Sequence, residues 1–168
     1  MRRALPILGG CTLLLAGCGS AAHPASVSTT STTTPTPNPT AQLQQAIRTA
    51  LQDNARVSDY VLEHNAIPSW AGKSTAGPAL AGMRGSAAQR RSGHLTVRVI
   101  SNEVQVRAID LDPSYTTATA IVTDRSRVLP YRNGRALGKD VKSSEKTRFE
   151  LHRVGNTMSF VVWRVAPA

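Results

Sequence analysis

The fold is decided by residues 94–124, which read HLTVRVISNEVQVRAIDLDPSYTTATAIVTD. Apolar and polar residues alternate with a period of two through most of this stretch, the pattern of strands that bury one face. We expect a turn at Ser101-Asn102, a second turn at residues 112–114, and a β-bulge near Ala108, where the apolar phase slips by one residue. The stretch therefore predicts antiparallel strands that follow one another along the chain.

The alternation continues toward the C-terminus. Asn133-Gly134 and Gly155-Asn156 are typical of turns, and Pro130 favours an edge position because it lacks an amide proton. Residues 147–152 and 159–165 are further strands by the same period-two pattern. The second half of the chain is therefore predicted to form a meander of antiparallel strands.

Two helices are expected before the strands. Apolar residues recur at three- and four-residue steps across residues 41–64, with Thr40 as the N-cap and an end near Asn65. A second helix has Pro78 in its first turn and Gly93 as its C′ residue. Its Gly82 and Gly85 are expected to permit a close approach of other backbone. Helices followed by a strand meander predict an α+β domain with the helices on one face of the sheet.

The first forty residues have a different composition. Arg2 and Arg3 precede a short apolar stretch, and Leu15-Ala16-Gly17-Cys18 resembles the bacterial lipoprotein box, in which cleavage falls before the cysteine. The resemblance implies that Cys18 carries a diacylglycerol and a further acyl chain such as palmitate, which anchors the chain to the extracytoplasmic face of the cell membrane. A plain secretion signal is the alternative. The predicted organisation is a lipoprotein signal peptide at 1–17, a disordered Ser/Thr/Pro-rich stalk at 18–40 and the α+β domain at 41–168.

Charge and cysteine content limit the function classes. The 168 residues include 20 Lys and Arg against 10 Asp and Glu, a formal charge of +10. A signal peptide takes this charge out of the cytoplasm, so we expect no nucleic-acid partner. Two cysteines exclude a disulfide-dense scaffold and a four-thiolate metal site.

Basic residues crowd the predicted hairpin around Asn133-Gly134. Such a positive surface near a membrane can bind anionic lipid headgroups or envelope polymers, and the alternative is a solvated basic rim with no partner. The residues of this predicted basic surface are Arg125, Arg127, Arg132, Arg135, Lys139, Lys142 and Lys146.

The order of elements resembles the nuclear-transport-factor-2-like (cystatin-like cone) fold, in which a curved sheet wraps a long N-terminal helix. More narrowly, residues 70–76, 80–84, 118–124 and the paired strands 148–153 and 158–163 resemble actinobacterial secreted proteins and lipoproteins of unknown function. Such relatives often carry a cysteine after the aspartate at the position of Asp124, paired with a C-terminal cysteine. Here Arg125 follows and the chain ends in Ala166-Pro167-Ala168, so that disulfide is not expected.

No pattern in the sequence specifies a catalytic or metal centre, and we expect no cofactor. His64, His94 and His152 are dispersed, and solvated or hydrogen-bonded side chains are favoured over a metal site. Asp110, Asp112 and Asp124 leave open a carboxylate cluster facing water, such as a weak Ca²⁺ site, but aspartate next to a turn more often stabilises the turn itself.

The cone resemblance implies a pocket, because ketosteroid isomerases and polyketide cyclases use an acidic base and a tyrosine inside the cone. The residues available for such a pocket are Tyr60, Trp70, Asp110 and His152. The sequence favours a non-enzymatic interaction or scaffolding domain in the cell envelope, with an anionic polymer, lipid headgroups or an envelope protein as partner. The alternative is binding of a hydrophobic small molecule, or isomerase- or cyclase-like chemistry, in the cone pocket.

Overall fold

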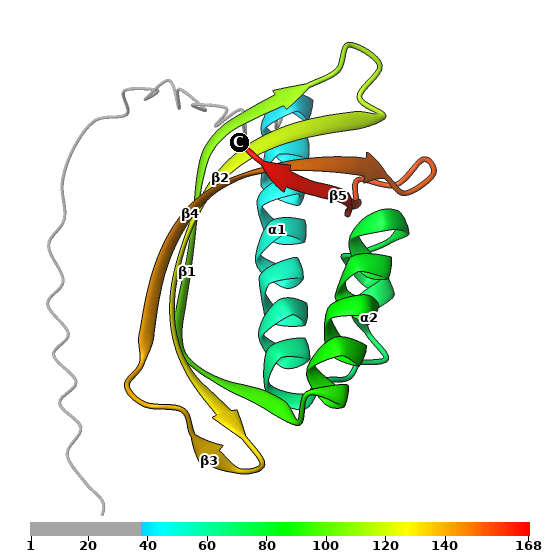
Figure 1. Cartoon of the computed structure of the whole chain (residues 1–168). Helices are drawn as coiled ribbons and strands as arrows, with labels where there is room; N and C mark the ends of the chain where they lie inside the picture. Colours follow the sequence, from blue (N-terminus) through cyan, green and yellow to red (C-terminus); the bar gives the residue numbers. More distant parts are fainter. Residues whose placement is uncertain (1–37) are drawn as a thin grey trace, which may run out of the picture. The chain divides into compact units, whose positions relative to one another are not determined.

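The computed structural model of the chain describes residues 38–168. The predicted signal peptide, the Cys18 anchor and nearly all of the predicted stalk lie outside the described residues. The elements are α1 (Pro39–His64), a short 3-10 helix η1 (Ala71–Lys73), α2 (Gly77–Ser92), β1 (Leu95–Leu111), β2 (Thr117–Arg132), β3 (Arg135–Ala136), β4 (Val141–Arg153) and β5 (Phe160–Pro167). Figure 1 shows both helices on the concave side of a curved sheet. The predicted α+β class, with two helices packed on a curved antiparallel sheet, is confirmed.

Helix α1 is capped at both ends by asparagine. Its N-cap is Asn38 and not the predicted Thr40, because the Asn38 side chain accepts a hydrogen bond from the Thr40 amide (3.0 Å) and Pro39 fits the first helical position. The helix therefore begins two residues before the predicted domain boundary at 41. At its other end Asn65 adopts a left-handed conformation (φ 51°), which ends the helix where the sequence predicts.

Helix α2 begins at Gly77 and packs more loosely than α1. Of its residues, Ala87 alone is buried. A Cβ atom added at Gly82 or Gly85 would meet nothing within 4 Å, so the expected close approach of backbone at these glycines is wrong. Gly93 caps the helix, but with φ −83° it does not adopt the left-handed C′ conformation. Within residues 38–168, neither this helix nor any other combines the length and apolarity needed to cross a membrane.

The strands pair antiparallel in the order β1-β2-β4-β5, with β3 paired to the far end of β2. The bulge predicted near Ala108 is confirmed by a register shift between Val106 and Ala108. The turn predicted at Ser101-Asn102 is wrong, because β1 continues through it with a second register shift after Val99. Pairing of β2 with β4 ends at Val128, two residues before Pro130, as expected for a residue without an amide proton.

The core fills the space between α1 and the concave face of the sheet. Alternate residues of β2 point toward the helix, as the sequence pattern predicts, and Ala120 and Val122 are fully buried. Ile47 and Leu51 of α1 pack in the same cluster as Leu151 of β4. This face is therefore closed under the middle of α1, and the next inward position along β2 is Asp124.

Candidate functional site

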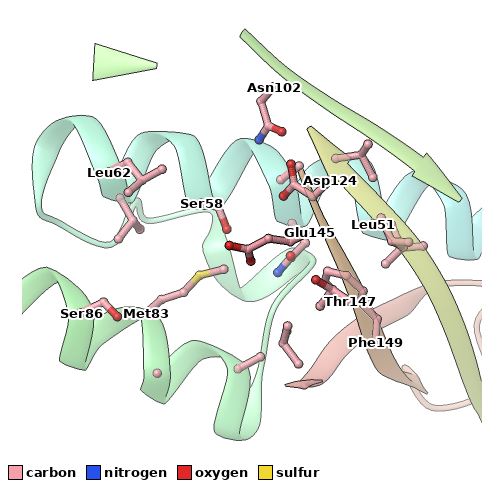
Figure 2. A pocket seen from close by; sticks show the side chains of 18 of the residues that line it. Leu51, Ser58, Leu62, Met83, Ser86, Asn102, Asp124, Glu145, Thr147 and Phe149 are labelled. Carbon is pink, nitrogen blue, oxygen red and sulfur yellow. The ribbon is translucent and has the colours of Figure 1, made fainter. Parts of the chain in front are cut away.

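A cleft of about 450 Å³ lies between α1, α2 and the concave face of the sheet. This volume falls in the range of small-molecule sites, about 300–1,000 Å³. Its apolar lining includes Leu62 of α1, Met83 of α2 and Phe149 of β4, and Figure 2 shows these side chains directed into the cleft. The part of α2 that faces the cleft also presents the small residues Ala79 and Gly82. The cleft can therefore hold an apolar body of small-molecule size.

Two carboxylates stand on the sheet side of the cleft. Asp124 of β2 lies directly opposite Glu145 of β4 in the strand register, and both line the cleft (Figure 2). Asp124 faces inward because it continues the alternation of Ala120 and Val122. Since directly opposite side chains on one face lie close together, two acidic groups share this part of the cleft wall.

An asparagine on the same side of the cleft links β1 to α1. Asn102 of β1 also lines the cleft, and its Nδ2 donates a hydrogen bond to Asp59 Oδ1 of α1 (2.8 Å). The other side-chain atom of this amide, Asn102 Oδ1, is buried and has no hydrogen-bond partner among residues 38–168. The same is true of Asp124 Oδ1. Both atoms are acceptors when the carboxyl is ionised, so this part of the cleft has a surplus of acceptors.

The same surroundings change the acidity of the two aspartates. Burial raises the pKa of Asp124, and the negative charges of Asp59 and Glu145 raise it further. Burial also raises the pKa of Asp59, against the lowering effect of its hydrogen bond from Asn102, and the charge of Glu63 adds to the rise. Asp124 on the cleft wall, and Asp59, which contacts that wall through Asn102, are therefore acidic groups whose ionised forms the protein stabilises poorly.

A buried amide also belongs to the polar lining, which further includes Ser58, Ser86, Thr147 and the cations Arg90 and Arg164. Asn54 of α1 is only 4% exposed yet lines the cleft. Its Nδ2 donates to Thr75 Oγ1 (2.8 Å), and this is the single side-chain hydrogen bond that Asn54 makes within the described part of the chain. Thr75 is fully buried and bridges to Val162 of β5, so Asn54 ties α1 to the loop that positions α2.

Comparison with known proteins identifies the fold and no family. No protein-family model matches the chain, and no curated protein matches it. The chain is similar to a solved structure, the intermembrane-space region of the chloroplast protein ARC6, with a TM-score of 0.62. The sequences are 10% identical, and the match covers 73% of this chain and 94% of that one. At this identity the likeness shows the fold alone, an α+β arrangement consistent with the nuclear-transport-factor-2-like cone.

The four residues predicted for the pocket do not gather in the cleft. None of Tyr60, Trp70, Asp110 and His152 is among the described residues that line the cleft. Tyr60 instead stacks on the ring of His64 (centroids 4.0 Å apart) and meets Trp70 edge-on (6.4 Å). It follows Asp59 and precedes the buried Val61, and a rotation of about 100° per residue carries it off the buried stripe.

The other two predicted pocket residues lie on the sheet surface that points away from α1. Asp110 is exposed, since its neighbours Ile109 and Leu111 take the inward positions of β1. His152 lies next to the fully buried Leu151 and points the other way. Its ring stacks on Trp163 (4.8 Å), and its Nε2 lies 2.8 Å from Glu150 Oε1.

The three aspartates considered for a cation site separate in the structure. Asp112 stabilises its turn, where its carboxylate accepts hydrogen bonds from the amides of Ser114 and Thr117 (both 2.6 Å), as the turn interpretation predicts. Hydrogen bonds from the hydroxyls of Ser114 and Thr117, and to a lesser degree those from the two amides, lower the pKa of Asp112. Asp110 and Asp124 lie on opposite faces of the sheet. Within residues 38–168, no three His, Cys, Asp or Glu side chains are placed to hold a metal ion.

The predicted basic residues are all exposed. Arg127 and Lys142 are direct cross-strand neighbours on the face that points away from the helices, and Arg127 forms an ion pair with Asp140. Lys146 and Arg125 lie on the same face by alternation. The basic surface is therefore separate from the cleft.

The sequence gives no indication of Asn54, Asn102 or Glu145 as site residues, and it considers Asp124 only as a member of an open, water-facing carboxylate cluster. The sequence does carry one signal for Asp124. It stands two residues after the buried Val122, at the next inward position of β2. The contact between Asn102 and Asp59 joins residues 43 positions apart, and no local pattern reports it.

Proposed function

We propose that the chain is a lipid-anchored domain on the extracytoplasmic face of a bacterial cell membrane, and that it binds a small apolar ligand in its cleft. The observation that carries the proposal is the open cleft of about 450 Å³ between α2 and the sheet. The sequence ranked an interaction or scaffolding role above a pocket. The cleft supports the opposite order, because its size and apolar lining suit a small molecule.

Binding is favoured over catalysis by the position of Tyr60. Isomerase-like chemistry in a cone pairs a carboxylate base with a phenol, and Tyr60 stacks against His64 outside the cleft. Asp124 has the surroundings of a base, namely burial beside apolar groups, but the described lining places no phenol or imidazole beside it. We therefore assign the cleft to ligand binding.

The anchor is proposed from the sequence. The lipoprotein box at Cys18 and the resemblance to actinobacterial secreted proteins and lipoproteins support an acylated, membrane-held chain. Metabolic labelling with palmitate tests the anchor, and we expect the label to be lost in Cys18→Ser. Labelling that persists in this variant would show that acylation occurs elsewhere.

The cleft is tested by filling it. Ser58 of α1 lines the cleft, whereas Gln52 of the same helix is exposed and lies outside it. We expect the full chain carrying Cys18→Ser, which lacks acyl chains, to bind the neutral fluorescent probe N-phenyl-1-naphthylamine. Adding Ser58→Phe should weaken binding about tenfold or more, because the ring occupies space that the probe needs, and adding Gln52→Phe should leave it unchanged. Equal probe binding by both variants, or none by the parent chain, would contradict the proposal.

A second function is favoured by the basic surface. Lys142 lies directly opposite Arg127, and within residues 38–168 Asp140 pairs with Arg127 while Lys142 forms no salt bridge, so an anionic partner would relieve the remaining repulsion. We propose that this surface contacts anionic lipid headgroups or envelope polymers. Reversing the charges of Lys139, Lys142 and Lys146 should reduce binding to anionic liposomes, and the difference should shrink as salt rises. Equal, salt-insensitive binding by the parent chain and the variant would refute this function without touching the cleft.

A further inference from the structure

We infer that the ligand of the cleft carries a cationic hydrogen-bond donor, a primary ammonium or guanidinium group, attached to its apolar body. This inference rests on the proposed binding function and specifies its ligand. It follows from three properties of the cleft wall: unpartnered acceptors, uncompensated negative charge, and an apolar lining beside both.

The first property is the surplus of acceptors. Asn102 Oδ1 and Asp124 Oδ1 are buried without a hydrogen-bond partner among residues 38–168. Asn54, 96% buried at the cleft, uses its Nδ2 on Thr75 and has its carbonyl oxygen left to accept. Buried polar groups are nearly always paired, and leaving an acceptor unpaired is costly. A ligand group with several N–H donors supplies the partners that Asn102 Oδ1 and Asp124 Oδ1 lack, and the Asn54 carbonyl oxygen is a further acceptor at the cleft.

The second property is the charge. Asp124 and Glu145 lie opposite each other in register, and no salt bridge reaches either one within the described part of the chain. Two cations line the cleft, and neither forms a salt bridge with Asp124 or Glu145 within the described part of the chain. Arg90 donates to Asn65 Oδ1 (3.0 Å) and to Val61 O (3.1 Å), and Arg164 lies 3.9 Å from Glu150 Oε2. At the wall formed by Asp124 and Glu145, a cation from the ligand would therefore neutralise charge that no ion pair compensates, whereas an anion placed there would be repelled.

The third property is the neighbouring apolar surface. Leu62, Met83 and Phe149 line the same cleft, and the flexible thioether of Met83 adapts to hydrocarbon or aromatic bodies. The small residues of α2 leave room for such a body. The geometry points to an amine or guanidine whose charged end contacts the sheet and whose apolar end lies between the two helices.

Four matched probes test this ligand class. They are 6-phenylhexylamine, its N,N,N-trimethyl derivative, 6-phenylhexanol and 6-phenylhexanoate, which share one body and differ only in the head group. Binding is measured by titration calorimetry on the full chain carrying Cys18→Ser, at fixed ionic strength. We expect the primary amine to bind about tenfold or more tightly than the alcohol, because charged hydrogen bonds exceed neutral ones. The carboxylate should bind more weakly than the alcohol.

Variants locate the head group. Asp124→Asn should bring the amine to the affinity of the alcohol, and Glu145→Gln should reduce its affinity in part. Asp110→Asn, a matched change on the exposed face away from the helices, should have no effect. Thermal unfolding of each variant confirms that it is folded.

The outcomes separate the two proposals. Failure of all four probes to bind refutes the binding function itself. If the alcohol or the carboxylate binds as tightly as the amine, the binding function stands but the inference is overturned. A protonated Asp124 that donates a hydrogen bond within the protein would give this result. Equal binding of the trimethyl derivative, which has no N–H, would also overturn it, because the acceptors would then play no part.

Discussion

Gly77 decides how α2 meets the sheet, and Gly77→Ala is the sharpest test of that contact. Gly77 adopts φ +50°, and a Cβ atom there would lie 2.7 Å from Cδ2 and Cε3 of Trp163. The chain cannot simply move away, because the Ala76 amide donates to Val162 O (2.9 Å) immediately before the glycine. The hydrogen bonds between the segment before α2 and Val162 of β5 therefore hold Gly77 against the indole ring.

The cost of the substitution can be worked from these two facts. A left-handed conformation costs a residue with a Cβ about 1 kcal/mol, and forcing an atom into a packed site costs about 1–3 kcal/mol more. We expect Gly77→Ala to lower the free energy of unfolding by about 2–4 kcal/mol, which for a domain of this size lowers the thermal midpoint by about 6–16 °C.

Gly85→Ala is the matched control, because Gly85 lies inside the same helix and its added Cβ would meet nothing within 4 Å. Alanine is the better helix former there, so this change should raise stability by about 0.5–1 kcal/mol. Both variants are compared with the parent chain by circular dichroism during heating and during urea unfolding. Equal midpoints for Gly77→Ala and the parent would refute the argument that the indole contact positions α2.

Three further predictions concern the core and the two aspartates with opposite pKa shifts. Leu151→Ala removes a fully buried side chain and should cost about 2–5 kcal/mol in urea unfolding, whereas Leu137→Ala at a half-exposed position should change little. The pKa of Asp112 is lowered in the fold, so the stability that Asp112 contributes is present above its unfolded pKa of about 3.9 and is lost on acidification. The stability gap between the parent chain and Asp112→Ala should therefore narrow when unfolding is repeated near pH 3 instead of pH 7. The pKa of Asp124 is raised, so its ionised form destabilises the fold and Asp124→Asn should gain stability at about pH 7, a gain that disappears as the pH falls below about 4. A gain that is independent of pH would contradict the assignment of this effect to the buried charge.

The elements could be predicted from the sequence where the pattern is local. The stripe that includes Ile47 and Leu51 buries as its spacing requires, and the strands around Val122 alternate as expected. The interpretation of Ser101-Asn102 was wrong because a turn and a bulge share the same polar residues. Long-range pairing decides between them, since β2 continues past this point and holds β1 to it.

The pocket prediction rests on the chemical type of the residues. The direction of each side chain depends on which residues pack beside it in space, and the sequence pattern does not report this. Tyr60 was selected as a phenol on the long helix, yet His64 lies one turn farther along and takes its ring as a stacking partner. His152 similarly pairs with Trp163 and Glu150. Each of these groups contacts a partner that does not line the cleft.

The cleft itself arises from a combination that neither helix nor sheet shows alone. Ala79, Gly82 and Ser86 recur at three- and four-residue steps along α2, so one face of that helix presents small side chains to the cleft. A small face alone would let α2 pack more closely on the sheet. Opposite it, however, the inward positions of β2 and β4 carry Asp124 and Glu145, and closing the gap would bury two carboxylates without partners. Small residues on one wall therefore leave room, and charge on the other keeps the cleft from collapsing.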